Sequence, residues 1–290
     1  MMRKLIYVAL VIIGCWFAAY AAHAAELQAP DTVTAGTSAT LHTRGSGDAS
    51  FYLIGPGHVK KRKVRLGEDI GLDAQSLRQA GRYLAVLRHG AATDSAWFYV
   101  KAAKPANVNF LARPSRVPVD KHDVISGTAF LFDAYRNLVL DPTPVKFDLA
   151  LPDAPAVTRT VQSKLGVAWV RLGSTRKQGP AQFVAAVDET QVRRVVQEVA
   201  SDPCNLRMRA ERKENNIIVE TDVVRDCSGN PVPDGTIVTF TQVDTNGRST
   251  VDARVKKGIA RAQLPASDDA TISVASGVVL GNEIRIGGRR

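Results

Sequence analysis

One passage of this chain occurs twice. The stretch DAYRNLVLDPTPVKF, residues 133–147, aligns without a gap with DCSGNPVPDGTIVTF, residues 226–240, which begins 93 residues later. A second match, GVAWVRL from Gly166 and GIARAQL from Gly258, extends the likeness beyond a single loop. Solenoid repeats have periods of roughly 20 to 50 residues, so a repeat of this length is a whole domain rather than one turn of a solenoid.

Both copies run into a strand-like pattern. In VKFDLAL, residues 145–151, the first, third, fifth and seventh residues are apolar and the second and fourth are charged, as a half-buried strand requires. The run from Thr236 to Val243 repeats this pattern. Asn246-Gly247 predicts a two-residue hairpin turn of the primed type, which needs positive φ angles. Elsewhere, short alternating runs separated by Gly, Pro, Asn and Asp predict antiparallel sheets.

The segment before the repeats contains a different sequence motif. Tyr83 follows Gly81 at the entry to a predicted strand, and a tyrosine there can return its hydroxyl to upstream backbone, the tyrosine corner of immunoglobulin-like sandwiches. The length of the repeat suits the same fold. We therefore expect an all-β protein of three tandem immunoglobulin-like β-sandwich domains, residues 25–102, 103–200 and 201–290, after a signal peptide at residues 1–24.

The repeated passage resembles a known family. Its pattern, D-x-x-x-N-x-V-x-D-x-T-x-V-x-F, is similar to bacterial immunoglobulin-like domains of the invasin and intimin type, over about residues 104–290. The residues that carry it are Asp133, Asn137, Val139, Asp141, Thr143, Val145 and Phe147, and then Asp226, Asn230, Val232, Asp234, Thr236, Val238 and Phe240. The later copy matches better, because the earlier one lacks the glycine before its Asn and the proline after it. The first domain is only generically immunoglobulin-like. The resemblance implies an extracytoplasmic stalk or adhesion module.

The Asp and Asn of the motif have a local interpretation. Asp226 and Asn230 bracket a turn, because their short side chains can bond nearby backbone, and Pro231 and Pro233 fix φ before the next strand. We interpret the motif as structural. Calcium binding by these oxygen-rich turns is the alternative, but the chain has no EF-hand-like alternation of acidic residues, and we expect no metal.

The first residues favour export. Arg3 and Lys4 precede an apolar run from Leu5 to Ala22, and Ala22-His23-Ala24 supplies the small residues of a signal-peptide cleavage site. Two alternatives stay open: lipidation of Cys15, or retention of the run as a membrane anchor. We expect the protein in the periplasm, at the outer membrane or on the cell surface, with membrane contact only through this segment or a lipid on Cys15.

The cysteines and histidines indicate which metal sites, disulfides and catalytic sites the chain could form. Without Cys15, the pair Cys204 and Cys227 remains, and in an oxidising compartment an even pair predicts a disulfide; two ligands alone make a poor zinc site. The five histidines are scattered, and no HExxH, GxSxG or phosphate-loop pattern occurs. We expect a non-enzymatic protein without a cofactor.

Positive charge concentrates in HVKKRKVRL, which begins at His58, and the whole chain has a net charge of +10. The candidate anion-binding residues are Lys60, Lys61, Arg62, Lys63 and Arg65. A strand of this sequence presents cations on both faces, so we expect an exposed edge strand or loop, where lysines also prevent edge-to-edge aggregation. The alternative is an anionic partner, such as a surface glycan or phospholipid headgroups. The lack of interleaved aromatic residues disfavours nucleic acid.

Trp97-Phe98-Tyr99 and Trp169 raise the question of a carbohydrate-stacking surface. A strand whose large residues alternately fill a core and contact a neighbouring domain explains them better. The sequence thus predicts a binding or adhesion module in the cell envelope or at the surface, whose partner is an envelope or surface protein or an anionic glycan. The alternative is a structural scaffold or spacer in a periplasmic, secretion or pilus-type assembly.

Overall fold

The computed structural model describes residues 26–152 and 155–287, so the predicted signal peptide and Cys15 lie outside the described residues. Within this part of the chain every element is a β-strand, apart from one short 3₁₀ helix, η1 (Ala74–Leu77). The all-β prediction is therefore confirmed. Two compact units can be distinguished: one runs up to Asn107 and includes Leu131–Asp141, and the other comprises Val108–Phe130 and the chain from Pro142 onward. The division into three domains, at residues 102 and 200, stays a prediction.

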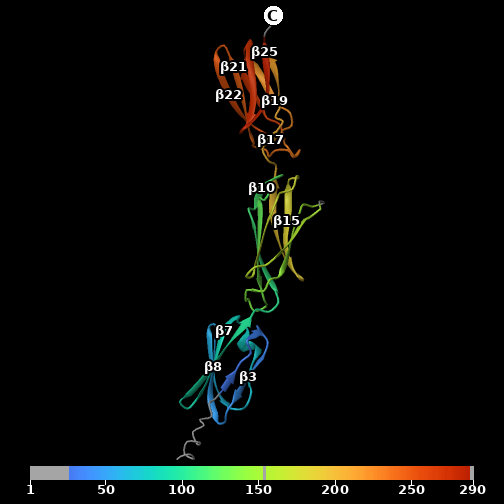
Figure 1. Ribbon diagram of the computed structural model, residues 1–290. Helices are drawn as coiled ribbons and strands as arrows, with labels where there is room; N and C mark the ends of the chain where they lie inside the picture. The colour runs from blue at the N-terminus through green and yellow to red at the C-terminus, as the bar shows by residue number, and fades with distance from the viewer. Residues whose placement is uncertain (1–25, 153–154, 288–290) are drawn as a thin grey trace, which may run out of the picture. The chain divides into compact units, whose positions relative to one another are not determined.

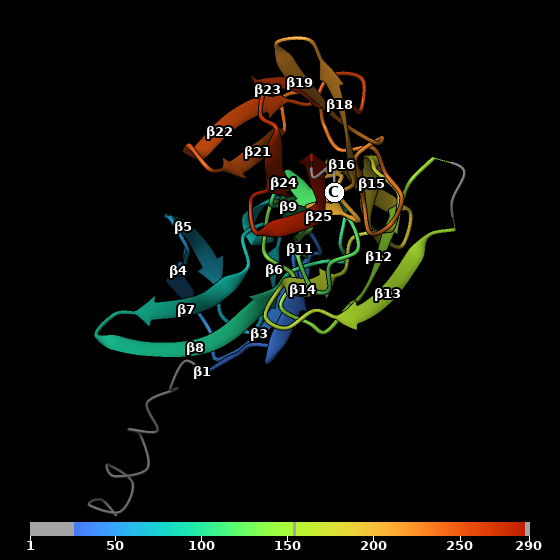
Figure 2. The same cartoon turned by 90° about the horizontal axis from the view of Figure 1, so that it is seen from above.

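The strands of residues 26–101 form two sheets around one core (Figure 1). The five-stranded sheet contains, in order, β2 (Thr32–Thr34), β8 (Ala92–Lys101), β7 (Gly81–His89), β4 (Asp48–Gly55) and β5 (His58–Arg65). The second sheet contains β1 (Glu26–Gln28), β3 (Ala39–Arg44) and β6 (Ile70–Leu72). Figure 2 shows β5, β4, β7 and β8 following one another across the larger sheet. Phe51, Leu53, Tyr83 and Phe98 are at most 2 % exposed between the sheets.

Residues 107–199 repeat this arrangement. Their five-stranded sheet contains, in order, β10 (Arg116–Pro118), β16 (Thr190–Val199), β15 (Gly179–Val187), β12 (Pro144–Ala150) and β13 (Val157–Gln162). The facing sheet contains β14 (Val167–Leu172), β11 (Ile125–Phe132) and β9 (Asn107–Arg113). Three mutually contacting rings, Phe110, Phe147 and Phe183, occupy the core. In each five-stranded sheet, the strand that comes first in the chain is short and runs parallel to the strand that comes last. These pairs are β2 with β8 and β10 with β16.

Residues 203–287 form a third group of sheets. The largest contains β22 (Gly247–Arg254), β21 (Ile237–Asp244), β24 (Asp269–Ser276) and β25 (Val279–Gly287). The others contain β18 (Met208–Lys213), β19 (Asn216–Thr221) and β23 (Arg261–Pro265), and then β17 (Pro203–Cys204) and β20 (Arg225–Asp226). Val238 and Phe240 of β21 are fully buried, as are Val145 and Phe147 of β12. The two strands predicted from the repeat are thus confirmed.

The second sequence match is also a structural match. Lys164 bridges to Val167 and Lys256 to Ile259. In each case the two residues between them adopt positive φ, 51° and 80° at Leu165 and Gly166, and 51° and 84° at Lys257 and Gly258. The repeat therefore extends to the conformation of individual turn residues.

The predicted hairpin at Asn246-Gly247 is present, but its predicted turn is wrong. Asp244 pairs with Gly247, so Thr245 and Asn246 are the central residues of the turn. Gly247 has a positive φ of 128°, whereas Asn246 does not. The reason is local: the carboxylate of Asp244 accepts a hydrogen bond from Asn246 N at 2.8 Å, which fixes the turn without the left-handed conformation.

Candidate functional site

The basic run occupies β5, at the edge of the five-stranded sheet, so the prediction of an exposed edge strand is confirmed. Strand alternation divides the run into two sets. Lys60 and Arg62 pair with the core residues Leu53 and Phe51 of β4, and their side chains therefore turn toward the opening between the two sheets. Lys61, Lys63 and Arg65 lie on the outer face. The sequence predicted cations on both faces without separating their roles.

The inward cations bind the chain's own groups. Lys60 Nζ donates to Ser76 Oγ at 2.5 Å and lies 3.8 Å from Asp73, and Arg62 donates to the carbonyl of Gly71 at 2.5 Å. Hydrogen bonds from the side chain and backbone of Ser76 lower the pKa of Asp73, and Lys60 lowers it further. A hollow of about 250 Å³ lies among these residues. Lys60 and Arg62 therefore fit the role of an edge guard.

The outward cations border a different surface, on the outer side of β5, β4 and β7. Lys61 pairs with Tyr52 and holds its Nζ 5.3 Å from the ring centroid, while Lys63 pairs with Ser50, which in turn pairs with Arg88 of β7. Two hollows of about 350 and 370 Å³ share Tyr52 and Arg88. Among the described residues, no carboxylate lies within ion-pair distance of Lys61, Lys63 or Arg88. Arg88 was missed from the sequence, because its place here depends on the pairing of β7 with β4, which a local sequence pattern does not specify.

The aromatic cluster of β8 alternates as expected. Phe98 is buried in the core, whereas Trp97 and Tyr99 are 51 % and 55 % exposed. Arg82 lies over the Trp97 ring, 3.9 Å from its centroid, so one face of that ring is already covered. Tyr99 borders a hollow of about 410 Å³ together with Leu138 and other residues of the same unit. Trp169 is 56 % exposed, and Cζ of Arg171 lies 5.9 Å from the centroid of its ring.

The repeated Asp and Asn make the local bonds that were predicted. Asp133 Oδ1 accepts from the N–H groups of Tyr135 and Asn137, at 2.8 and 2.9 Å. Asp226 Oδ1 accepts from Ser228 and Asn230 in the same way, at 2.9 and 2.8 Å. The second carboxylate oxygen of each aspartate accepts from the corresponding Asn side chain. Each aspartate therefore organises its own turn.

Both motifs also reach beyond their own turn, which the sequence did not reveal. Asp133 Oδ2 accepts from Ala103 N, and Asp226 Oδ2 from Ser201 N, in the stretches where domain boundaries are predicted. Asn137 donates to Arg78 O and accepts from Ala80 N, at 2.7 and 2.8 Å.

Asn230 makes the same pair of bonds with Arg176 O and Gln178 N, at 2.8 and 3.1 Å. Each Asn thus joins its loop to a backbone segment of the preceding group of strands. We call these two arrangements the first and the second junction.

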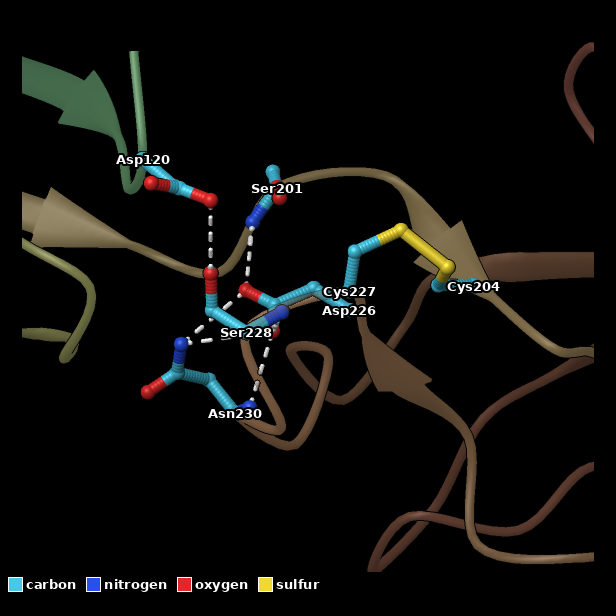
Figure 3. Close-up of a disulfide and its surroundings, with 7 residues drawn as sticks. All are labelled: Asp120, Ser201, Cys204, Asp226, Cys227, Ser228 and Asn230. Atoms are coloured by element: carbon cyan, nitrogen blue, oxygen red, sulfur yellow. Dashed lines mark hydrogen bonds between the residues drawn. A yellow bond between two sulfur atoms is a disulfide. The ribbon is translucent and has the colours of Figure 1, made fainter.

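The contacts beside the two junctions differ in chemistry. In the first, the Tyr135 ring occupies the space that a side chain on Gly36 would need, and Gly36 has a φ of 75°. In the second, Asp120, with a φ of 58°, takes the corresponding place and accepts from Ser228 Oγ at 3.3 Å (Figure 3). A glycine facing a large ring is replaced by an acid facing a hydroxyl.

The predicted disulfide is confirmed and belongs to the second junction. Cys204 and Cys227 are bonded, with Cα atoms 4.9 Å apart. Cys227 directly follows Asp226, and Figure 3 shows the disulfide beside the bonds of Asp226 to Ser201 and Asn230. Burial raises the pKa of Asp226, but the bonds from Asn230, Ser201 and Ser228 outweigh it, and the net shift is downward. Asp226 is therefore held as a carboxylate.

The backbone segments that receive the Asn side chains are supported differently. In the first junction, the predicted tyrosine corner is confirmed: Tyr83 Oη donates to Gln79 O at 3.0 Å, and Ser76 O is 3.3 Å away. In the second, Ala181 takes the place of the tyrosine, two residues after Gly179, as Tyr83 stands two residues after Gly81.

Glu198 supports the second segment instead. This buried side chain accepts from Thr175 N at 2.8 Å and from Thr175 Oγ at 2.5 Å. Burial raises the pKa of Glu198, and the two bonds from Thr175 lower it less. Its other oxygen has no hydrogen-bond partner within the described chain.

Neither a metal-binding cluster nor a membrane-spanning helix is present in the described residues, 26–152 and 155–287. No group of three or more His, Cys, Asp or Glu side chains lies together in a way that could hold a metal ion. In residues 26–152 and 155–287, no helix is long and apolar enough to cross a membrane.

Comparison with known proteins places the fold. No protein-family model and no curated protein matches the chain. Among solved structures, an adhesin of Escherichia coli, FdeC, is similar with a TM-score of 0.61 and 14 % identity, over 92 % of this chain and 97 % of that one. InvD of Yersinia pseudotuberculosis is similar with a TM-score of 0.52 and 10 % identity, over 91 % and 97 %. At this level of identity the likeness concerns the fold alone: the chain has an immunoglobulin-like β-sandwich fold similar to that of these two bacterial proteins.

Proposed function

We propose that this chain is an exported, non-enzymatic binding module that attaches to a cell-envelope or cell-surface ligand through an exposed sheet face. The observation that carries the proposal is the outer face of β5, β4 and β7, where Lys61, Lys63 and Arg88 surround Tyr52 and form no ion pair with any carboxylate of the described residues. Charged side chains left unpaired beside surface hollows are available to a partner.

Two further observations support the same function. FdeC, whose structure is similar to this chain, is an adhesin. The disulfide between Cys204 and Cys227 fits folding in an oxidising compartment, as the predicted signal peptide requires. Export places the basic face where surface ligands are available.

Attachment of protein-coated beads tests this function. Beads carrying the purified exported protein should adhere to intact bacteria or to epithelial cells well above albumin-coated beads, and soluble protein should compete. Attachment no greater than that of albumin on every surface tested would contradict the proposal.

A scaffold or spacer role is the second candidate, and the two junctions favour it. Asn137 and Asn230 each bind backbone groups outside their own loop, and such bonds restrict movement between the segments they join. Crosslinking the protein in intact cells separates the candidates. A scaffold should recover a defined set of envelope proteins, including when Lys61 and Lys63 are replaced by Gln.

A further inference from the structure

We propose that the outer face of β5, β4 and β7 binds an acidic polysaccharide, with Lys61, Lys63 and Arg88 contacting its carboxylate or sulfate groups. This rests on the proposed binding function and assigns it a site and a ligand class. The site is narrower than the basic run, because it excludes Lys60 and Arg62, which turn inward, and Arg65, which borders neither hollow. It adds a cation from a second strand, Arg88.

The spacing of the cations suits a chain with regularly repeated charges. Lys61 and Lys63 are two residues apart on one strand, about 7 Å along it. Lys63 and Arg88 flank Ser50 on the neighbouring strands, about 10 Å apart across the sheet. An extended polymer with an acidic group on successive sugar units can meet all three. A single small anion would reach only one or two of them.

The surface between the cations also suits sugars. The two hollows that share Tyr52 and Arg88 have volumes of about 350 and 370 Å³ and are bordered by Ser50 and Thr93. Their lining therefore combines an aromatic ring with hydroxyl groups and one acidic residue, Asp48, which can contact the apolar faces and the hydroxyl groups of a sugar.

The same geometry disfavours single-stranded nucleic acid. Nonspecific nucleic-acid binding needs aromatic faces on which bases stack. The residues that border the two hollows include one aromatic ring, Tyr52, so no row of rings lies between the cations for successive bases to stack on.

A matched pair of variants tests the site. Lys61→Gln/Lys63→Gln removes two outward cations, and Lys60→Gln/Arg62→Gln removes two inward cations from the same strand, so both lose the same charge. Binding of the exported protein is measured by biolayer interferometry over a salt series. The probes are immobilised polygalacturonic acid and heparin, with neutral dextran, single-stranded oligothymidine, and phosphatidylcholine vesicles containing phosphatidylglycerol.

We expect wild-type protein to bind both acidic polysaccharides and not dextran. The outward variant should bind about 10-fold more weakly at low salt, and its salt dependence should be shallower by about two counterions, whereas the inward variant should bind like wild type. Arg88→Gln should weaken binding further. If the inward variant proves unfolded by circular dichroism, Lys256→Gln/Lys257→Gln provides the charge control.

Each other outcome overturns the proposal. Equal losses in the two variants would mean diffuse attraction by net charge. Tighter binding to oligothymidine or to the anionic vesicles would identify the wrong ligand class. Bead attachment without polysaccharide binding would leave the binding function in place and remove this ligand.

Discussion

The two junctions use the same bonds to the backbone and different means to support them. Both have an aspartate that organises its turn and an Asn that binds a carbonyl and an N–H of a preceding segment. The supporting group is Tyr83 in the first junction and Glu198 in the second. Only the second junction has a disulfide. The two junctions therefore share the hydrogen bonds from Asn to the backbone, whereas different side chains support the backbone segment in each.

The largest difference between the junctions should come from the disulfide. Replacing Cys204 and Cys227 with Ala should lower the free energy of unfolding of the second junction's strands by about 3 kcal/mol, because the bond closes a loop with a sequence separation of 23. Calorimetry with and without reductant measures this. The variant should be insensitive to reductant, and an unchanged transition would show that the bond contributes no stability.

Adding a disulfide to the first junction tests whether the two junctions have the same backbone geometry. Ala106 and Ala134 occupy the places of Cys204 and Cys227 in the first copy, and Ala106 N donates to Phe132 O at 2.8 Å. Ala106→Cys/Ala134→Cys should therefore form a disulfide on export. Mass mapping of unreduced peptides checks it, and two free thiols would mean that the junctions differ in backbone geometry.

The next largest effect should be shared by both junctions. Asn137→Ala and Asn230→Ala each remove two bonds to backbone groups, and each should cost about 2 kcal/mol. Asn246→Ala, in the exposed hairpin turn, is the control and should cost much less. Denaturant titration of the three variants measures these costs. If only one of the two junction variants is destabilised, the junctions are not equivalent.

A smaller effect should separate Gly36 from Asp120. Gly36→Ala places a side chain against the Tyr135 ring at a φ of 75° and should cost about 1.5 kcal/mol. Asp120→Gly relieves a positive φ while losing one long hydrogen bond and an exposed ion pair with Arg176 at 3.9 Å, and should change stability by less than about 0.5 kcal/mol. Thermal unfolding of both variants tests this asymmetry, and equal costs would refute it.

The smallest effect should appear as a pH dependence. The raised pKa of Glu198 means that the folded state binds its proton more tightly than the unfolded chain does. Protonated Glu198 therefore contributes to the free energy of unfolding. This contribution is fully present below the pKa of the unfolded chain and is lost as pH rises through the pKa of the folded state. Glu198→Gln should therefore gain stability relative to wild type as pH rises from 4 to 7. A constant difference over that range would contradict the assignment. Tyr83→Phe, which removes the supporting hydroxyl of the first junction, should show a constant loss over the same pH range.

Much of the fold could be predicted, because burial leaves a periodic trace in sequence. Phe147 and Phe240 alternate with polar residues, and Tyr83 stands at a recognisable corner. The junctions left no such trace: the groups that Asn137 and Asn230 bind are main-chain atoms, which every residue has. The split of the basic run followed from strand alternation, but the inclusion of Arg88 depended on the pairing of β4 with β7, which a local pattern does not specify.

The reliance of Asn137 and Asn230 on main-chain atoms has a consequence for how such chains evolve. The preceding segments, Arg78-Gln79-Ala80-Gly81 and Arg176-Lys177-Gln178-Gly179, differ in sequence yet present the same carbonyl and N–H. A duplicated or transplanted repeat can therefore dock onto a new predecessor without matching substitutions on both sides. Gene duplication can lengthen or reorder the array in a single step, while the outer sheet faces diverge independently to acquire new ligands.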